Sequence, residues 1–199
     1  MTSHLRETVA FLRSIGIACR LQDGATGFLE KIRIVNGGLA FQPDVEVEDV
    51  LHEAGHLAII PERYRPLAND DLEGVNAAMG RDIDADLCEI DSPLMCAMLQ
   101  ASEPEATAWA FAAGMHLGLP PHVIISDGSY GGGGRVVRQQ LQLRGHLGIN
   151  GLWHSQMCAR PSQKHLPQYP NLLCWTQHIG SDESDRLSPY RIEPVRMTT

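Results

Sequence analysis

Long apolar runs are absent from this sequence of 199 residues. No stretch approaches the roughly 18 consecutive apolar residues that a membrane-spanning helix requires. The N-terminal segment MTSHLRETVAFLRSIG carries charges at Arg6, Glu7 and Arg13, whereas a secretory signal peptide needs an unbroken apolar centre. We therefore expect no membrane partner, and we interpret this segment as an amphipathic helix.

Cysteine is scarce and scattered. The five cysteines form no C-x-x-C pair; they are Cys19, Cys88, Cys96, Cys158 and Cys174. An odd, scattered set is untypical of the disulfide frameworks of secreted proteins. Hydrophobic residues make up 43% of the chain, which is enough for a core without disulfide support. We expect reduced thiols and a cytoplasmic location.

Positive charge is also in short supply. The 16 lysines and arginines are outnumbered by 24 aspartates and glutamates, which gives a formal net charge of −8. This charge repels phosphate backbones, and no basic stripe along the chain offsets the repulsion. We therefore expect no nucleic acid as a partner.

Neither an internal repeat nor a second domain is visible, and the length fits one domain. Prolines recur from about residue 159, and no helical or strand period holds beyond that point. We expect a single domain over residues 1–199, with an irregular C-terminal region packed over it.

The pattern predicts an α+β fold. Residues 3–15 have helical periodicity, residues 17–22 alternate as a strand does, and residues 31–43 predict a β-hairpin around Asn36-Gly37-Gly38. Helical periodicity resumes in three segments, which are residues 47–60, 103–117 and 135–143. Ser102, with glutamate three residues later, has the sequence of a capping box at the start of the second of these helices.

The sequence His52-Glu53-Ala54-Gly55-His56 falls inside the predicted helix of residues 47–60. Histidines at positions i and i+4 of a helix lie one above the other, so both imidazoles can bind one metal ion. Zinc accepts neutral imidazole ligands, and a catalytic zinc site keeps one position for water. Glu53 is placed to take a proton from that metal-activated water as general base.

A third ligand is available at the start of the next predicted helix, in Glu103-Pro104-Glu105-Ala106. Together the two segments resemble the zincin-like metallopeptidases of the ImmA/IrrE type, which combine H-E-x-x-H with a glutamate in an E-x-x-A context. The resemblance covers roughly residues 30–118 and implies a minimal gluzincin core, with the H-E-x-x-H helix packed against the helix of Glu103. It implies Zn²⁺ held by His52, His56 and Glu103.

Glu105 competes with Glu103 for the ligand position. At about 100° per residue, Glu103 lies some 60° from the centre of the small apolar face of its helix, and Glu105 about 100°. Glu105 also has a structural role available, as the acid of the capping box. Both could equally be first-turn carboxylates that the helix dipole favours. The family often has Asn or Asp four residues after the ligand glutamate, where this chain has Thr107.

An oxyanion-stabilising group is the last requirement of such a site. Tyr130 is the first candidate, because the glycines at 131–134 would let its loop close over the metal. His154 is the second. The leading hypothesis is a zinc-dependent metallopeptidase-like hydrolase that cleaves a peptide or protein substrate. The alternatives are a non-catalytic metal-binding or interaction protein with a zincin core, and a metal-dependent enzyme acting on a non-peptide amide.

Overall fold

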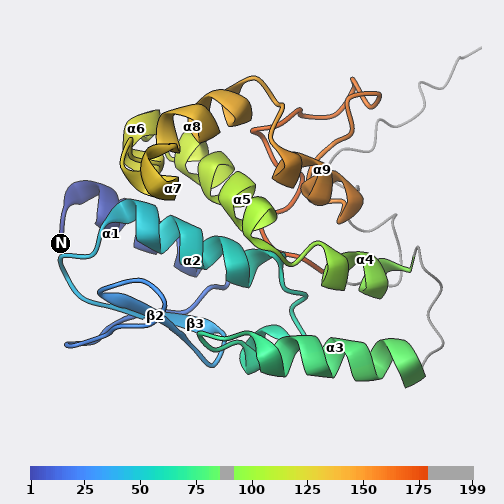
Figure 1. Cartoon of the computed structure of the whole chain (residues 1–199), viewed down its shortest axis with the longest axis horizontal. Coiled ribbons are helices and arrows are strands. Elements are labelled where there is room, and N and C mark those ends of the chain that lie inside the picture. The colour runs from blue at the N-terminus through green and yellow to red at the C-terminus, as the bar shows by residue number, and fades with distance from the viewer. Residues whose placement is uncertain (86–91, 179–199) are drawn as a thin grey trace, which may run out of the picture.

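A computed structural model describes residues 1–85 and 92–178 (Figure 1). Cys88 and residues 179–199 of the expected C-terminal region lie outside this described part. Within it the fold is α+β, as predicted, with a three-stranded sheet and these helices: α1 (Ser3–Ser14), α2 (Val47–Ile59), η1 (Arg65–Leu67), α3 (Glu73–Ala85), α4 (Pro93–Leu99), α5 (Glu103–His116), α6 (Pro121–Ile124), α7 (Ser129–Gly132), α8 (Gly134–Gln142) and α9 (Leu147–His154).

The sheet is mixed and small. Its strands are β1 (Cys19–Leu21), β2 (Ile32–Val35) and β3 (Gly38–Phe41), in the order β1-β3-β2. β2 and β3 pair in antiparallel fashion and β1 runs parallel to β3, so the predicted hairpin and the preceding strand are both confirmed. Asn36 and Gly37 take positive φ at the turn, as a tight hairpin requires.

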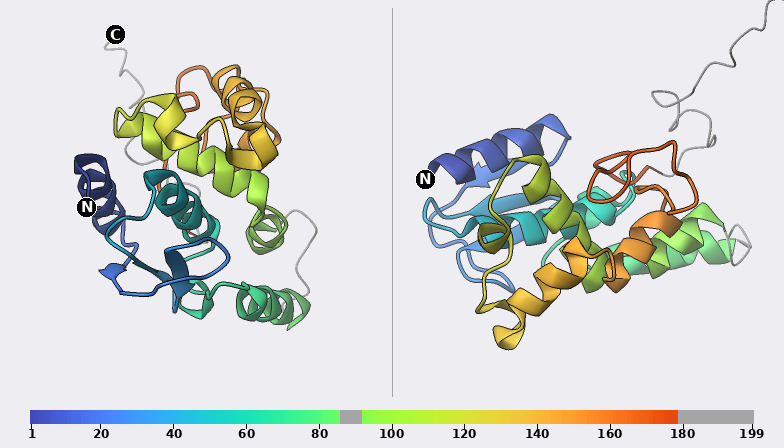
Figure 2. Two further views of the ribbon diagram at one scale, coloured as in Figure 1. Left: turned by 60° about the vertical axis from the view of Figure 1, so that its left-hand side comes forward. Right: turned by 90° about the horizontal axis from the view of Figure 1, so that it is seen from above.

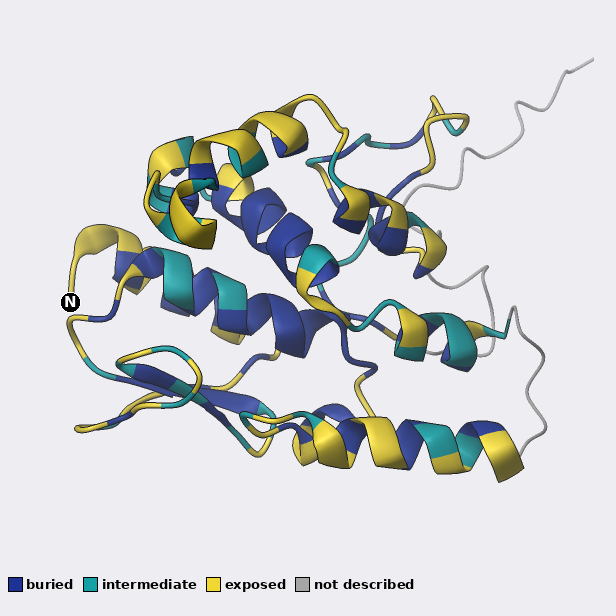
Figure 3. Cartoon of the chain, viewed as in Figure 1, coloured by how far each residue is buried: buried dark blue, intermediate teal, exposed yellow. Residues whose placement is uncertain are grey.

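Helix α2 is the central element of the fold. It lies between the sheet and α5 (Figure 1), while α1 packs against α2 and β1 (Figure 2). Its residues facing both layers are buried (Figure 3), and α5 is buried from Glu105 to Gly114. A helix with apolar neighbours on two sides holds its polar side chains in a fixed frame, which suits a site built on it.

Gly55 sets the distance between α2 and α5. A Cβ atom at this position would lie 2.5 Å from the carbonyl oxygen of Ala106 and 3.0 Å from its Cα. Only a residue without a side chain permits this approach of two helix backbones. The close contact brings the first turn of α5 against the third turn of α2.

Five α-helices of the described part were absent from the predictions; α6 and α7 are single turns, and the other three are longer. In α3, the buried Val75, Ala78, Met79 and Ile83 form a weak apolar face among many polar residues. The short α4 is capped by the Ser92 hydroxyl, which accepts a hydrogen bond from Met95 N. Helix α9 contains Gly148 and Gly151, which are poor helix formers but are required because α9 packs directly on Pro104 and Glu105 of α5. Tertiary contacts outweigh propensity there.

Residues 159–178 contain neither helix nor strand and pack over α5 and the end of α2. Three hydrogen bonds attach this segment to α5 and α2: Tyr169 OH donates to Ala108 O, Trp109 Nε1 donates to Trp175 O, and Gln177 N donates to Ala58 O. None of the helices in residues 1–85 and 92–178 has the length and apolar character needed to cross a membrane.

Candidate metal centre

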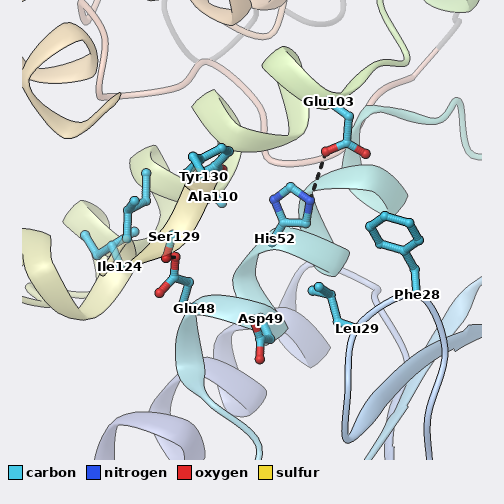
Figure 4. Close-up of a pocket in the computed structure, with 11 residues that line it drawn as sticks. Phe28, Leu29, Glu48, Asp49, His52, Glu103, Ala110, Ile124, Ser129 and Tyr130 are labelled. Carbon is cyan, nitrogen blue, oxygen red and sulfur yellow. Dashed lines mark hydrogen bonds and ion pairs between the residues drawn. The ribbon is translucent and has the colours of Figure 1, made fainter. Parts of the chain in front are cut away.

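Two imidazoles and one carboxylate converge where α2 meets the start of α5. Figure 4 shows two of these three groups, His52 and Glu103. The Nε2 atoms of His52 and His56 are 3.3 Å apart. His52 Nε2 lies 3.1 Å from Glu103 Oε2, and His56 Nε2 lies 3.1 Å from Glu103 Oε1. The structure therefore brings together the three residues that the sequence predicts as metal ligands.

The spacing of these donors fits a zinc ion. A zinc–nitrogen distance of about 2.0–2.1 Å places neighbouring ligand atoms of a tetrahedron about 3.3–3.4 Å apart. The 3.3 Å between the two Nε2 atoms matches one edge of such a tetrahedron, and each Nε2 lies 3.1 Å from a different oxygen of Glu103; with a single carboxylate oxygen, the three ligand atoms lie within 4.8 Å of one another. Imidazole nitrogen and carboxylate oxygen are both ligands that zinc accepts, and three protein ligands leave a fourth position. The residues present fit the metal.

The helix geometry of α2 produces this arrangement. His52 and His56 are separated by one turn, and their rings meet edge to face, with centroids 4.9 Å apart and an interplanar angle of 86°. His56 is buried, whereas Glu103 has a side chain 67% exposed. One side of the cluster therefore faces the core and the other faces solvent, where a substrate can approach.

The side chains of the cluster shift one another's pKa values. Hydrogen bonds from His52 and then His56 hold the pKa of the Glu103 carboxyl well below its usual range. Burial disfavours a charged His52 imidazole, but the hydrogen bond to Glu103 and the nearby carboxylates outweigh it, so the pKa of His52 is raised. The carboxylate of Glu103 and the imidazole of His52 thus each favour the charged form of the other.

His56 Nδ1 is buried and has no hydrogen-bond partner within the described residues. Histidine ligands ordinarily donate this nitrogen's proton to an outer carbonyl or carboxylate, and losing that partner weakens metal binding about 10–100-fold. We expect zinc affinity below that of sites with a complete outer shell.

Glu53 lies beside the cluster and is almost completely enclosed. Its side chain is 7% exposed, and it lines a cavity with His56 and Glu103. Burial raises the pKa of its carboxyl, and the neighbouring histidines partly offset the effect. Within the described residues its carboxylate accepts no hydrogen bond, so it is available to a water molecule or a substrate.

Glu105 is directed away from the histidines. It is buried against Gly151 of α9, and its carboxylate accepts a hydrogen bond from the Ser102 hydroxyl. The predicted capping box is wrong in this respect, because Ser102 makes no side-chain bond to the backbone of α5 and bonds to the carboxylate instead. The packing of α9 gives Glu105 a structural role.

Tyr130 stands at the edge of the cavity next to the cluster (Figure 4). Its hydroxyl shares a 2.8 Å hydrogen bond with Thr107 Oγ1. Tyr130 and Gly131 both have positive φ, of 54° and 66°, so the backbone turns sharply there. His154, the other candidate, is exposed, bonds to Asn150 O in its own helix, and lines neither cavity beside the cluster.

Sequence reasoning missed the anchor of the Tyr130 loop. Glu48, one turn before His52 on α2, accepts hydrogen bonds from Ser126 N at 2.9 Å and from the Ser129 hydroxyl. These bonds tie the loop to the helix that carries the histidines. A carboxylate in the first turn of a helix is common for reasons of the helix dipole, so the sequence held no separate signal for this role.

Two cavities flank the cluster and share Phe28 and Glu103 as lining residues. The larger has a volume of about 340 Å³, and its lining includes Leu29, Ile124 and Ile125 as well as the carboxylates of Glu48 and Asp49. The smaller has a volume of about 180 Å³ and contains Glu53, Asp70 and Asp71. The cluster thus lies between a larger and a smaller lobe of a groove open to solvent, and both lobes are lined by carboxylates and apolar side chains.

Comparisons of this chain with protein-family models, with characterised proteins and with solved structures find no significant match. The interpretation of the site therefore depends on its own residues, which are two imidazoles, the exposed carboxylate of Glu103, the buried carboxylate of Glu53 and the hydroxyl of Tyr130.

Proposed function

We propose that this protein is a zinc-dependent hydrolase of the metallopeptidase kind. The observation that carries the proposal is the convergence of His52 Nε2, His56 Nε2 and the Glu103 carboxylate within 4.8 Å, with Glu53 enclosed beside them. Two histidines that served only to pack the core would need neither the Glu103 carboxylate at both Nε2 atoms nor the Glu53 carboxylate next to them.

The order of elements supports a zincin-like core. A hairpin precedes the H-E-x-x-H helix α2, and the glutamate ligand opens the next long helix packed on it, α5. This is the arrangement that the sequence resemblance implies for zincin-like metallopeptidases. We accordingly propose peptides or proteins as the substrate class and zinc as the metal.

Each residue has a role in this proposal. When bound, zinc acts as a Lewis acid that polarises a carbonyl group and lowers the pKa of water. Glu53 takes the proton of the attacking water and later gives it to the leaving amine, and its raised pKa suits both transfers. The Tyr130 hydroxyl donates a hydrogen bond to the oxygen that becomes negative as the carbonyl carbon turns tetrahedral.

The test of the proposal is Glu53→Gln, which removes the base and keeps the volume. Zinc content should stay near that of the wild type, while cleavage of a proteome-derived peptide library, followed by mass spectrometry, should fall by about 100-fold or more. Glu73→Gln makes the same change at an exposed position of α3 and should cleave as the wild type does. Unchanged cleavage by the Glu53→Gln variant would refute the mechanism.

A further inference from the structure

The smaller cavity beside the metal ligands is lined in part by carboxylates. Glu53, Asp70 and Asp71 surround it, and neither lysine nor arginine is among its described lining residues. Glu53 is more than nine-tenths buried there and makes no hydrogen bond within the described residues. A buried carboxylate without a partner is costly, and a cationic ligand would supply the missing interaction.

Asp70 is fixed by the protein itself. Its Oδ1 accepts a 2.7 Å hydrogen bond from Ile34 N, and its Oδ2 lies 3.1 Å from Arg33 Nη2. Asp71 is exposed and accepts only a local bond from Glu73 N at 3.2 Å. Asp70 is therefore neutralised by Arg33, and Asp71 carries the charge that faces outward.

The charges around this lobe do not cancel. The carboxylates of Glu53, Glu103, Asp70 and Asp71 contribute four negative charges, while Arg33 and a bound zinc ion contribute three positive ones. One negative charge remains, and it is located at Asp71, on the open side of the cavity. A cation on the substrate complements this charge.

An aromatic ring completes the lobe. Phe28 is 86% exposed and does not belong to the hydrophobic core. Its loop is pressed against Asp70, because a Cβ atom on Gly27 would lie 2.6 Å from Asp70 Oδ1 and 2.9 Å from Arg33 Cβ. The glycine thus permits a close approach that keeps the ring beside the carboxylates. Aromatic faces attract ammonium and guanidinium groups within about 6 Å of their centroids.

We propose that the mouth of this lobe, formed by Phe28 and Asp71 outside the catalytic Glu53, binds a lysine or arginine side chain of the substrate next to the bond that is cleaved. The inference rests on the proposed peptidase function and specifies its substrate class. The larger lobe on the other side of the cluster also contains two further carboxylates, Glu48 and Asp49, but Glu48 already accepts hydrogen bonds from Ser126 N and the Ser129 hydroxyl.

The experiment is cleavage-site profiling of the zinc-loaded protein on a proteome-derived peptide library. Lysine and arginine should be enriched at one fixed position beside the scissile bond. Asp71→Asn should lower kcat/KM for lysine-containing peptides roughly fivefold and leave norleucine counterparts unchanged, as expected for one partly exposed charge pair. Phe28→Ala should reduce the same preference, whereas Asp84→Asn, with the same loss of charge on the exposed face of α3, should not.

A binding assay decides the question if no library peptide is cleaved. Two pools of labelled, randomised octapeptides, one with lysine and one with norleucine at the centre, are titrated with zinc-loaded protein by fluorescence anisotropy. Binding of the lysine pool about fivefold more tightly, with the difference lost in Asp71→Asn, supports the inference whatever becomes of the hydrolase. Equal binding, or cleavage without basic preference, overturns the inference and leaves the metal centre untouched.

Discussion

Gly55 offers the sharpest test of how the fold builds the site. A methyl group added there would lie 2.5 Å from the Ala106 carbonyl oxygen, so α2 and α5 would have to separate by about 0.5 Å to restore even a tight contact of 3.0 Å. Overpacking of this kind costs about 1–3 kcal/mol of the free energy of unfolding. Alanine recovers at most about 1 kcal/mol through its better helix propensity.

The contact joins two backbones, so no rotamer change relieves it, and we expect a net loss of about 2 kcal/mol for Gly55→Ala. Because Glu103 opens the helix that is displaced, zinc affinity should also fall at least tenfold, about 1.4 kcal/mol. Urea unfolding and zinc titration measure the two effects.

Gly80→Ala is the matched control, since a Cβ atom on Gly80 of α3 has no neighbour within 4 Å. That substitution should stabilise the protein by about 0.5–1 kcal/mol and leave zinc affinity unchanged. If Gly55→Ala proves as stable as Gly80→Ala and binds zinc as the wild type does, the argument from helix approach is refuted.

Further predictions concern individual groups of the site. Glu103→Gln should weaken zinc binding at least tenfold in a competition titration, whereas Glu105→Gln should keep the affinity and instead lower the free energy of unfolding by about 1 kcal/mol. Tyr130→Phe should lower kcat by about 100-fold with little change in KM, and Thr107→Val should give a smaller loss of the same kind; a change confined to KM would contradict the oxyanion role. The pKa of His52 is raised in the metal-free protein, and a protonated imidazole cannot bind zinc. As the pH is lowered, zinc affinity should therefore begin to fall at a higher pH than it does for an ordinary histidine ligand. Zinc titrations at several pH values measure this effect.

Helix α2 and the hairpin could be predicted from local sequence patterns. Apolar spacing and Pro61 define α2, and the Asn36-Gly37 turn defines the hairpin between β2 and β3. The helical period alone was enough to predict that His52 and His56 lie on one face of the helix. These features depend on residues close in sequence, which is why sequence reasoning reached them.

The rest depends on contacts between distant segments. Helix α9 forms across Gly148 and Gly151 because α5 lies against it, and no local signal announces that packing. The choice of Glu103 over Glu105 as the residue beside the histidines is likewise made by α9, which encloses Glu105. Phe28 belongs to a loop without periodicity, so its position beside the metal ligands emerges only in three dimensions.

The most direct test of the central claim is metal content by plasma mass spectrometry, on protein purified without added metal or chelator. We expect near-equimolar zinc in the wild type and in His154→Ala, whose exposed histidine lies away from the cluster, and loss of zinc in His56→Ala. Absence of zinc from the wild type, followed by failure to take up zinc on reconstitution, would contradict the account.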